Sequence, residues 1–185
     1  MSFLFFIIIP MLLVGWAQMR VRSAFNKYSR VPSTAGISGA ETARRILNEQ
    51  GIYDVAVEET GGALSDHYDP RSKVVRLSSE NFHGHSLAGL AVAAHEVGHA
   101  MQHAQGYLPL NFRHAILPVA NLGSSLGMPL IMAGFFFSAS GLLDIGILLF
   151  AGAVLFQLVT LPVEFNASSR AMAILAQGYI AGDEV

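Results

Sequence analysis

Three long apolar blocks constrain the fold of this chain more than any other feature. They cover residues 1–19, 115–138 and 141–163, and none of them contains Lys or Arg. Blocks of this kind approach or exceed the ~20 residues that a helix needs to cross the hydrocarbon of a bilayer. Over the whole chain 52% of residues are hydrophobic and only 13% are charged, which is roughly half the usual charged share. We therefore predict a mainly α integral membrane protein with three transmembrane helices.

Both parts of this prediction have an alternative. The first block could be a cleaved signal peptide, but positive charge follows it, at positions 20–30, instead of preceding it, and no small-residue cleavage site is present. An uncleaved anchor, with Trp16 at the membrane interface, is the better interpretation. The second and third blocks could form the buried hairpin of a soluble protein. Their combined length without a solvated face favours two membrane spans instead.

The positions of Lys and Arg predict the orientation in the membrane. All eleven lie between Arg20 and Arg113 or at Arg170, and the connection "SASGLLD" between the last two blocks has none. By the positive-inside rule the amino terminus faces out, and both the segment after the first block and the chain beyond the third face the cytoplasm. We divide the chain into an anchor (1–19), a cytoplasmic domain (20–113), a transmembrane hairpin (114–163) and a cytoplasmic carboxyl-terminal segment (164–185).

Two features of composition exclude other classes. The chain has no cysteine, so it cannot form disulfides, and a reducing compartment is permitted. Its net charge is −2, and no basic stripe interleaved with aromatic residues is present. We therefore expect no nucleic-acid partner. In the second block Gly123 and Gly127 form a G-x-x-x-G, a spacing that lets helices approach closely but that also arises by chance in a glycine-rich span.

The cytoplasmic domain combines short helices with a small sheet. Ser38 and Glu41 have the spacing of a capping box, which predicts a helix that ends at Gly51. The segment "IYDVAVEE" partly alternates, and "SDHYDPRSKVVRLS" is typical of a hairpin that turns at Asp69-Pro70. From Ser86, a favoured type of N-cap residue, an alanine-rich apolar run predicts one largely buried helix as far as Gly106.

That helix carries the sequence "AAHEVGHAMQH", with His95 and His99 one turn apart. Their Cβ atoms are expected about 6 Å apart on one face, so two imidazoles can bind one metal ion. Glu96 is rotated away from them, but it can reach a water at an open coordination position, as the general base of a metalloprotease does. The alternative is a helix with packed or solvated histidines. A metal would offset the cost of burying ionisable groups on this apolar helix.

A catalytic zinc usually has three protein ligands and a water, so one ligand remains to be found. His103 lies about 12 Å from His95 along the helix, which is too far for one ion. A metzincin would need Gly at position 102 and His at position 105, and both are Gln. The third ligand should therefore be a carboxylate from farther along the chain.

Four carboxylates follow the histidines: Asp144, Glu164, Asp183 and Glu184. The predicted topology places Asp144 across the membrane, and Asp183 and Glu184 lie in a tail that we expect to be frayed. Glu164 lies where the third block re-enters the cytoplasm. By elimination we assign Glu164 as the third ligand. Its alternative role is that of an interfacial carboxylate at a helix start.

The paired motifs "AAHEVGHAMQHA" and "LPVEFNASSRA" resemble the YugP-like family of membrane zinc metallopeptidases, and the resemblance extends over most of the chain. It implies a gluzincin arrangement in a small α+β, zincin-like unit, with Zn²⁺ bound by His95, His99 and Glu164 and with Glu96 as the catalytic base. Related gluzincins often carry Asp four residues after the ligand Glu, to orient a ligand His. Here that residue is Ser168, which brings no charge.

We therefore expect a multi-pass protein of the cell membrane that hydrolyses peptide bonds of polypeptides, including membrane proteins, with its active site facing the cytoplasm. If "KVVRLS" forms an open sheet edge, a substrate could add to it as a further strand. The residues able to stabilise the oxyanion are His67, Tyr68, Asn166, Arg170 and Tyr179.

Two other functions remain open. One is a non-catalytic membrane protein whose zinc site is structural or vestigial and which acts as an assembly partner. The other is a metal-dependent hydrolase of a non-peptide bond, which would use the same residues. The number of protein ligands distinguishes the first alternative, because closed structural zinc sites have four and usually include cysteine.

Overall fold

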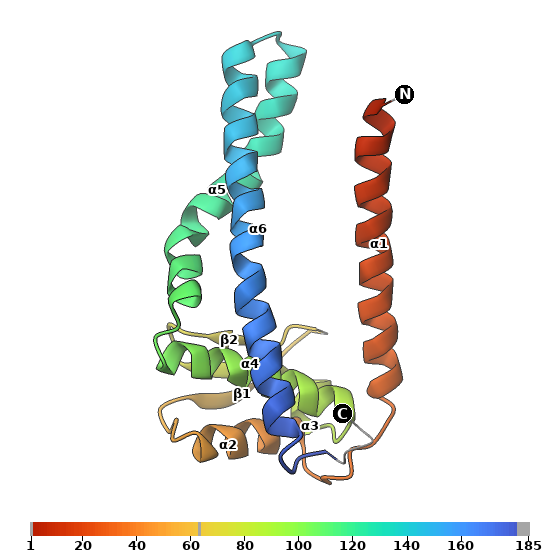
Figure 1. Cartoon of the computed structure of the whole chain (residues 1–185), viewed down its shortest axis with the longest axis vertical. Coiled ribbons are helices and arrows are strands. Elements are labelled where there is room, and N and C mark those ends of the chain that lie inside the picture. The colour runs from red at the N-terminus through yellow and green to blue at the C-terminus, as the bar shows by residue number, and fades with distance from the viewer. Residues whose placement is uncertain (1, 63, 181–185) are drawn as a thin grey trace. The chain divides into compact units, whose positions relative to one another are not determined.

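The computed structural model describes residues 2–62 and 64–180, which are mainly helical (Figure 1). Asp183 and Glu184 lie outside the described residues. The helices are α1 (Ser2–Tyr28), α2 (Gly39–Glu49), α3 (Ser79–His83), α4 (Leu87–Ala104), α5 (Leu108–Phe136) and α6 (Ser140–Leu175), and the strands are β1 (Ala56–Thr60), β2 (His67–Asp69) and β3 (Val74–Ser78). The chain divides into two compact units. One comprises the described residues of Met1–Val97 and Ala171–Val185, and the other comprises Gly98–Arg170.

Helix α2 begins and ends as the sequence predicts. The Ser38 hydroxyl accepts a hydrogen bond from the backbone N–H of Glu41 (3.2 Å), and the Glu41 carboxylate accepts one from the N–H of Ser38 (2.7 Å). This reciprocal pair satisfies two of the donors that a helix start leaves without an intrahelical partner. After the helix, Gly51 adopts a φ of +70°, which glycine adopts without steric cost. The capping-box prediction is confirmed.

The small sheet has the strand order β1-β3-β2. Strands β2 and β3 form the expected hairpin, with Tyr68 opposite Val75, while β1 pairs with β3 in parallel. The segment "KVVRLS" therefore forms the central strand, and the expectation that it could be an open edge is wrong. The reason is that β1, from earlier in the chain, occupies the other side of β3. Val75 and Leu77 are completely buried as a result.

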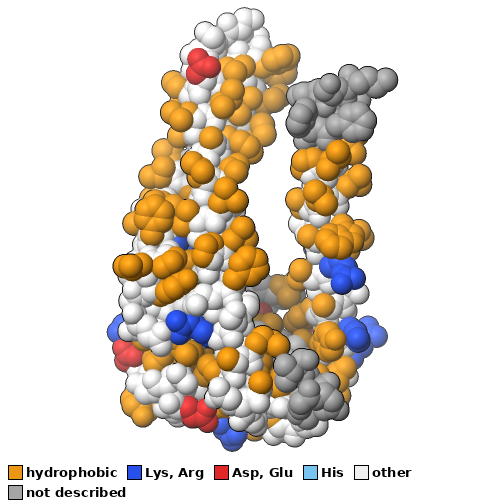
Figure 2. Space-filling view, viewed as in Figure 1, with side chains coloured by type: hydrophobic (Ala, Val, Ile, Leu, Met, Phe, Trp, Pro, Cys, Tyr) orange, Lys and Arg blue, Asp and Glu red, His pale blue; other side chains and the backbone are white. Residues whose placement is uncertain are grey.

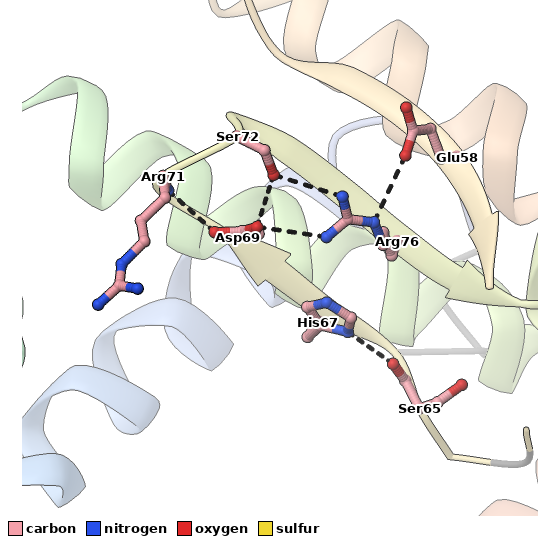
Figure 3. Close-up of polar contacts among 7 residues, drawn as sticks. All are labelled: Glu58, Ser65, His67, Asp69, Arg71, Ser72 and Arg76. Atoms are coloured by element: carbon pink, nitrogen blue, oxygen red, sulfur yellow. Dashed lines mark hydrogen bonds and ion pairs between the residues drawn. The ribbon is translucent and has the colours of Figure 1, made fainter. Parts of the chain in front are cut away.

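Asp69 holds the turn of the hairpin together (Figure 3). Its carboxylate accepts hydrogen bonds from the Ser72 hydroxyl (2.5 Å), the Arg71 backbone N–H (2.9 Å) and the Arg76 guanidinium (3.3 Å). Arg76 also lies 3.4 Å from the carboxylate of Glu58 on β1, so one guanidinium links all three strands. The hydrogen bonds from Ser72 and the Arg71 backbone, with a smaller contribution from Arg76, hold the pKa of Asp69 well below its usual range.

Helix α4 is largely buried, as its alanine-rich sequence predicts. The Ser86 hydroxyl accepts a hydrogen bond from the N–H of Gly89 (3.1 Å), so Ser86 caps the helix start. The helix ends two residues before Gly106, whose φ is +64°. The residues of α4 with no exposed surface are Leu90, Ala93, Ala94, Val97, Ala100 and Gln102. Small side chains on several faces let other elements approach this helix closely.

Helix α5 and the part of α6 that belongs to the second unit form a closely packed hairpin. A Cβ atom at Gly123 would lie 2.3 Å from the carbonyl oxygen of Leu149, and one at Gly127 would lie 3.1 Å from Phe150. Only glycine permits the first of these contacts, so the G-x-x-x-G spacing does serve helix packing. The most apolar windows of α5 and α6 are only 17% and 6% buried. Figure 2 shows apolar side chains gathered over this hairpin.

Among the described residues, α5 and α6 are the two helices long and apolar enough to cross a membrane. The first apolar block is helical within α1, and its role as a third span stays a prediction. Helix α6 runs on to Leu175, so the boundary that we placed between residues 163 and 164 lies inside one helix. Glu164 is therefore not at a helix start, because no glycine interrupts the chain between Gly152 and Gly178 and Pro162 does not end the helix.

Candidate metal centre

Helix α4 supplies both histidines of the H-E-x-x-H motif. His95 and His99 lie four residues apart on a continuous helix, so they occupy one face, one turn apart. Glu96, between them, is 8% exposed. Burial of a carboxyl group is costly unless it has partners, so this position is an unusual one for a glutamate in an apolar helix.

Gly98 lets helix α6 approach α4 beside His99. A Cβ atom at this position would lie 2.8 Å from the carbonyl oxygen of Ala167 and 3.2 Å from its Cα atom. Both obstructing atoms belong to the backbone and cannot rotate away. A glycine is therefore needed for the two helices to meet in this way.

The contact at Ala167 places Glu164, one turn earlier on α6, next to His99. The Glu164 Oε2 atom lies 3.4 Å from the His99 Nε2 atom, and the two side chains are 40% and 12% exposed. One ligand atom from each of His95, His99 and Glu164 can be chosen so that all three lie within 4.8 Å of one another. Glu164, the carboxylate that the sequence analysis names as third ligand, is the carboxylate in this group.

This group has the donor atoms of a zinc site, and one pair of them, from His99 and Glu164, has the spacing of zinc ligands. Ligand atoms at ~2.0–2.1 Å from a tetrahedral zinc lie roughly 3.3 Å apart, which matches the 3.4 Å between His99 and Glu164. Two imidazoles and one carboxylate are also the ligands of a known class of catalytic zinc site. The residues present therefore fit a zinc ion by the chemistry of their donor atoms.

Gln102 is a site residue that the sequence analysis did not identify. It served there only to exclude a metzincin, but its Oε1 atom lies 3.0 Å from the Nδ1 atom of His99. The available signal was its position three residues after His99, because residues three apart on a helix are neighbours. That position alone does not identify a histidine partner, because glutamines are common at exposed positions of helices.

The other carboxylates do not join this group. Asp144 lies on α6, 20 residues before Glu164 (164 − 144), which corresponds to about 30 Å of helix. Asp183 and Glu184 lie outside the described residues. His103, one turn beyond His99, is absent from the group that could hold a metal ion.

The five candidate oxyanion donors lie in several places. The Tyr179 hydroxyl donates to Glu49 on α2 (2.8 Å), and the His67 Nδ1 atom lies 2.7 Å from the carbonyl oxygen of Ser65 (Figure 3). Tyr68 is partly buried in β2, and burial raises its pKa to about 12. Asn166 and Arg170 lie on α6 within two turns of Glu164 and contact each other. We assign the role of oxyanion donor to none of these five residues.

Comparison with known proteins identifies the family of this chain. The chain belongs to the family described as "Putative neutral zinc metallopeptidase", whose model matches residues 3–185. It is also 50% identical over 185 residues to the "Putative membrane protease YugP" of Bacillus subtilis (strain 168), a match that covers all of this chain and 82% of that protein. The expected membership of a YugP-like family is confirmed. No solved structure matches the chain.

Proposed function

We propose that this protein is a membrane-bound, zinc-dependent endopeptidase. The observation that carries the proposal is the convergence of His95, His99 and Glu164, whose ligand atoms lie within 4.8 Å of one another. Membership of a zinc metallopeptidase family supports the same conclusion independently of the geometry. Within the proposal His95, His99 and Glu164 hold the ion, and Glu96 is the general base.

Each residue has a defined task in this reaction. Zinc bound at this site would supply a Lewis acid that polarises the scissile carbonyl and lowers the pKa of a bound water toward ~7. Glu96 accepts the proton of the attacking water and then donates it to the leaving amine. Its burial, at 8% exposed, keeps this carboxylate away from bulk water. The substrate class is a polypeptide.

The membrane location rests on the α5–α6 hairpin. A core helix of a soluble protein would be mostly buried, whereas the most apolar windows of these two helices are 17% and 6% buried. So much exposed apolar surface is stable in lipid and unfavourable in water. We propose two spans in this hairpin, a third in residues 1–19, and a metal centre that faces the cytoplasm because Lys and Arg cluster in residues 20–113.

A non-catalytic protein with a structural zinc is the second candidate. Structural zinc sites usually have four protein ligands with cysteine among them. This chain has no cysteine, and across residues 2–62 and 64–180 the group that could hold a metal contains three residues. Three protein ligands leave a position for water, so the ligand number favours the enzyme.

The test compares Glu96→Gln with the wild type, both purified in detergent. The variant should retain zinc, because residue 96 is not a ligand in this proposal, and should cleave an unfolded polypeptide about 10²–10⁴-fold more slowly, because the general base is lost. Glu80→Gln is the matched control, since Glu80 is an exposed carboxylate on α3. The control should retain both zinc and activity.

Two results would overturn the proposal. Full zinc-dependent cleavage by Glu96→Gln would remove the general base from the mechanism. A wild-type protein that binds stoichiometric zinc with four protein ligands and cleaves no polypeptide would establish the structural alternative.

A further inference from the structure

A chain of hydrogen bonds on α6 begins at Arg170, whose guanidinium can only donate. Its Nε atom donates to the Oδ1 atom of Asn166 over 2.7 Å. Because arginine cannot accept a hydrogen bond, the side-chain amide of Asn166 must turn its oxygen toward Arg170. The orientation of the Asn166 amide is therefore fixed by chemistry and not only by the shape of the site.

Gln102 on α4 donates to α6 at two points. Its Nε2 atom lies 2.8 Å from the carbonyl oxygen of Val163 and 3.0 Å from the same Oδ1 atom of Asn166. Both partners are acceptors, so the –NH₂ group of Gln102 must face them and uses both its protons there. The Gln102 side chain is completely buried, and a reversed amide would place its oxygen against two other oxygens.

The oxygen of the Gln102 amide then determines which nitrogen of the His99 imidazole carries the proton. With the nitrogen facing α6, the Oε1 atom faces the His99 Nδ1 atom at 3.0 Å. An amide oxygen only accepts, so Nδ1 carries the proton. In a neutral imidazole the other nitrogen then carries the lone pair. That nitrogen is Nε2, which lies 3.4 Å from Glu164.

We propose that Gln102 is a positioning residue that holds His99 in the tautomer able to bind zinc through Nε2. It also sets the place of the third ligand, because Val163, which accepts from Gln102, directly precedes Glu164. This inference rests on the metal site of the proposed function. Gln102 performs this task as a neutral side chain, without burying a charge.

A neutral amide suits this position better than a carboxylate. The same side chain must donate to two oxygens and accept from one nitrogen, and glutamine provides both kinds of group. A glutamate would lose both donors and bury a negative charge against the Val163 carbonyl and the Asn166 oxygen. Arg170 adds a further link between the two helices, because it also donates a hydrogen bond to Gln105, just beyond the end of α4 (2.7 Å).

The first measurement is the zinc dissociation constant, obtained by competition with a chelator in detergent. Gln102→Met has a similar length but neither donates nor accepts here, and it should bind zinc about 10–100-fold more weakly, as expected for loss of an outer partner of a ligand histidine. Gln50→Met is the matched control, because Gln50 is exposed at the end of α2. The control should retain the wild-type constant.

The second measurement reports the tautomer directly and needs neither zinc nor activity. The side-chain ¹⁵N spectrum of metal-free protein, at a pH of ~8 where imidazole is ordinarily neutral, should show His99 with its proton on Nδ1. The signal is assigned with a His99→Gln variant. In Gln102→Met the His99 signals should shift toward a mixture of both tautomers.

The outcomes separate this inference from the proposed function. An Nε2–H tautomer in the wild type, or an unchanged zinc constant and spectrum in Gln102→Met, would overturn it. Should Gln102→Met fail to fold, the wild-type spectrum alone decides. A protein that binds zinc and shows the expected tautomer but cleaves no polypeptide would contradict the endopeptidase and leave the role of Gln102 supported.

Discussion

At the scale of single residues, the candidate metal centre depends on side chains that orient one another through hydrogen bonds. His99 is oriented by Gln102, Gln102 by Asn166, and Asn166 by Arg170. Each link pairs a donor with an acceptor in a partly or fully buried place, where an unsatisfied polar group would cost about 1–3 kcal/mol. In the proposed site His99 is therefore oriented before any metal binds, and such preorganisation favours tight binding.

Glu164→Gln should weaken zinc binding more than any change outside the ligand set, because an amide is a poorer zinc ligand than a carboxylate. We expect a loss of more than the ~10–100-fold typical of outer partners. Asp144→Asn is the control on the same helix, about 30 Å away. Equal zinc constants for Glu164→Gln and Asp144→Asn, measured by chelator competition, would show that the third ligand is another group.

Asp69→Asn should destabilise the protein at neutral pH and have a smaller effect in acid. The folded-state pKa of Asp69 is lowered, so its carboxylate contributes stability that is present above the unfolded pKa of ~3.9 and is lost as the pH falls toward the folded value. Thermal unfolding of both proteins in detergent at pH 7 and at ~3 measures this. A difference in melting temperature that does not shrink in acid would show that the ionised carboxylate is not the stabilising form.

At the scale of elements, the contact between α4 and α6 decides whether the ligands meet. Gly98 removes the Cβ atom that would strike the Ala167 backbone, and glycines at positions 123, 127, 134 and 146 do the same between α5 and α6. In the sequence, the G-x-x-x-G spacing pointed to a close approach in the hairpin but left a chance occurrence equally open. The sequence contained no comparable indication for Gly98, because a single glycine in a helix does not form a recognisable motif.

Gly98→Ala should lower both the melting temperature and the zinc affinity. Alanine favours a helix over glycine by up to about 1 kcal/mol, but the added Cβ atom would lie 2.8 Å from a backbone oxygen, and such overpacking costs about 1–3 kcal/mol. Gly152→Ala on α6 is the control, since nothing lies within 4 Å of its added Cβ atom. Gly152→Ala should be neutral or stabilising, and a Gly98→Ala variant that behaves the same way would contradict the contact.

At the scale of the whole molecule, the proposed topology assigns segments to opposite sides of the membrane. The natural chain has no cysteine, so single cysteines can be introduced without a background. A thiol at residue 140, in the connection between the second and third blocks, should react outside the cell. A thiol at residue 53, where Tyr53 is 76% exposed, should react only after lysis. Positive charges flanking the spans are the physical basis of this orientation.

The measurement uses a membrane-impermeant maleimide on intact and lysed cells with Ser140→Cys and Tyr53→Cys. A Ser2→Cys variant tests the first block, because residue 2 reaches the outside only if residues 1–19 cross the membrane. Labelling of Tyr53→Cys in intact cells would place the metal centre outside. Protection of Ser2→Cys in intact cells would contradict a span in residues 1–19 and leave the two spans of the hairpin.

Features that depend on neighbours along the chain could be predicted from the sequence. The capping box of α2, the Asp69-Pro70 hairpin, the buried α4 and the two long apolar helices were all predicted, because local hydrogen bonds and hydrophobic periodicity are encoded within short segments. The one-turn spacing of His95 and His99 follows from helix geometry in the same way. Glu164 was reached by elimination among few carboxylates, which a sequence poor in charge made possible.

Features that depend on contacts between distant segments became known from the three-dimensional fold. It placed β1 beside β3 and so made "KVVRLS" a central strand, and it extended α6 without a break through Glu164. It also brought Gly98 against Ala167 and Gln102 against Val163. These last two pairings join residues more than sixty positions apart in α4 and α6, and no local pattern specifies which side chains will face each other once two helices pack.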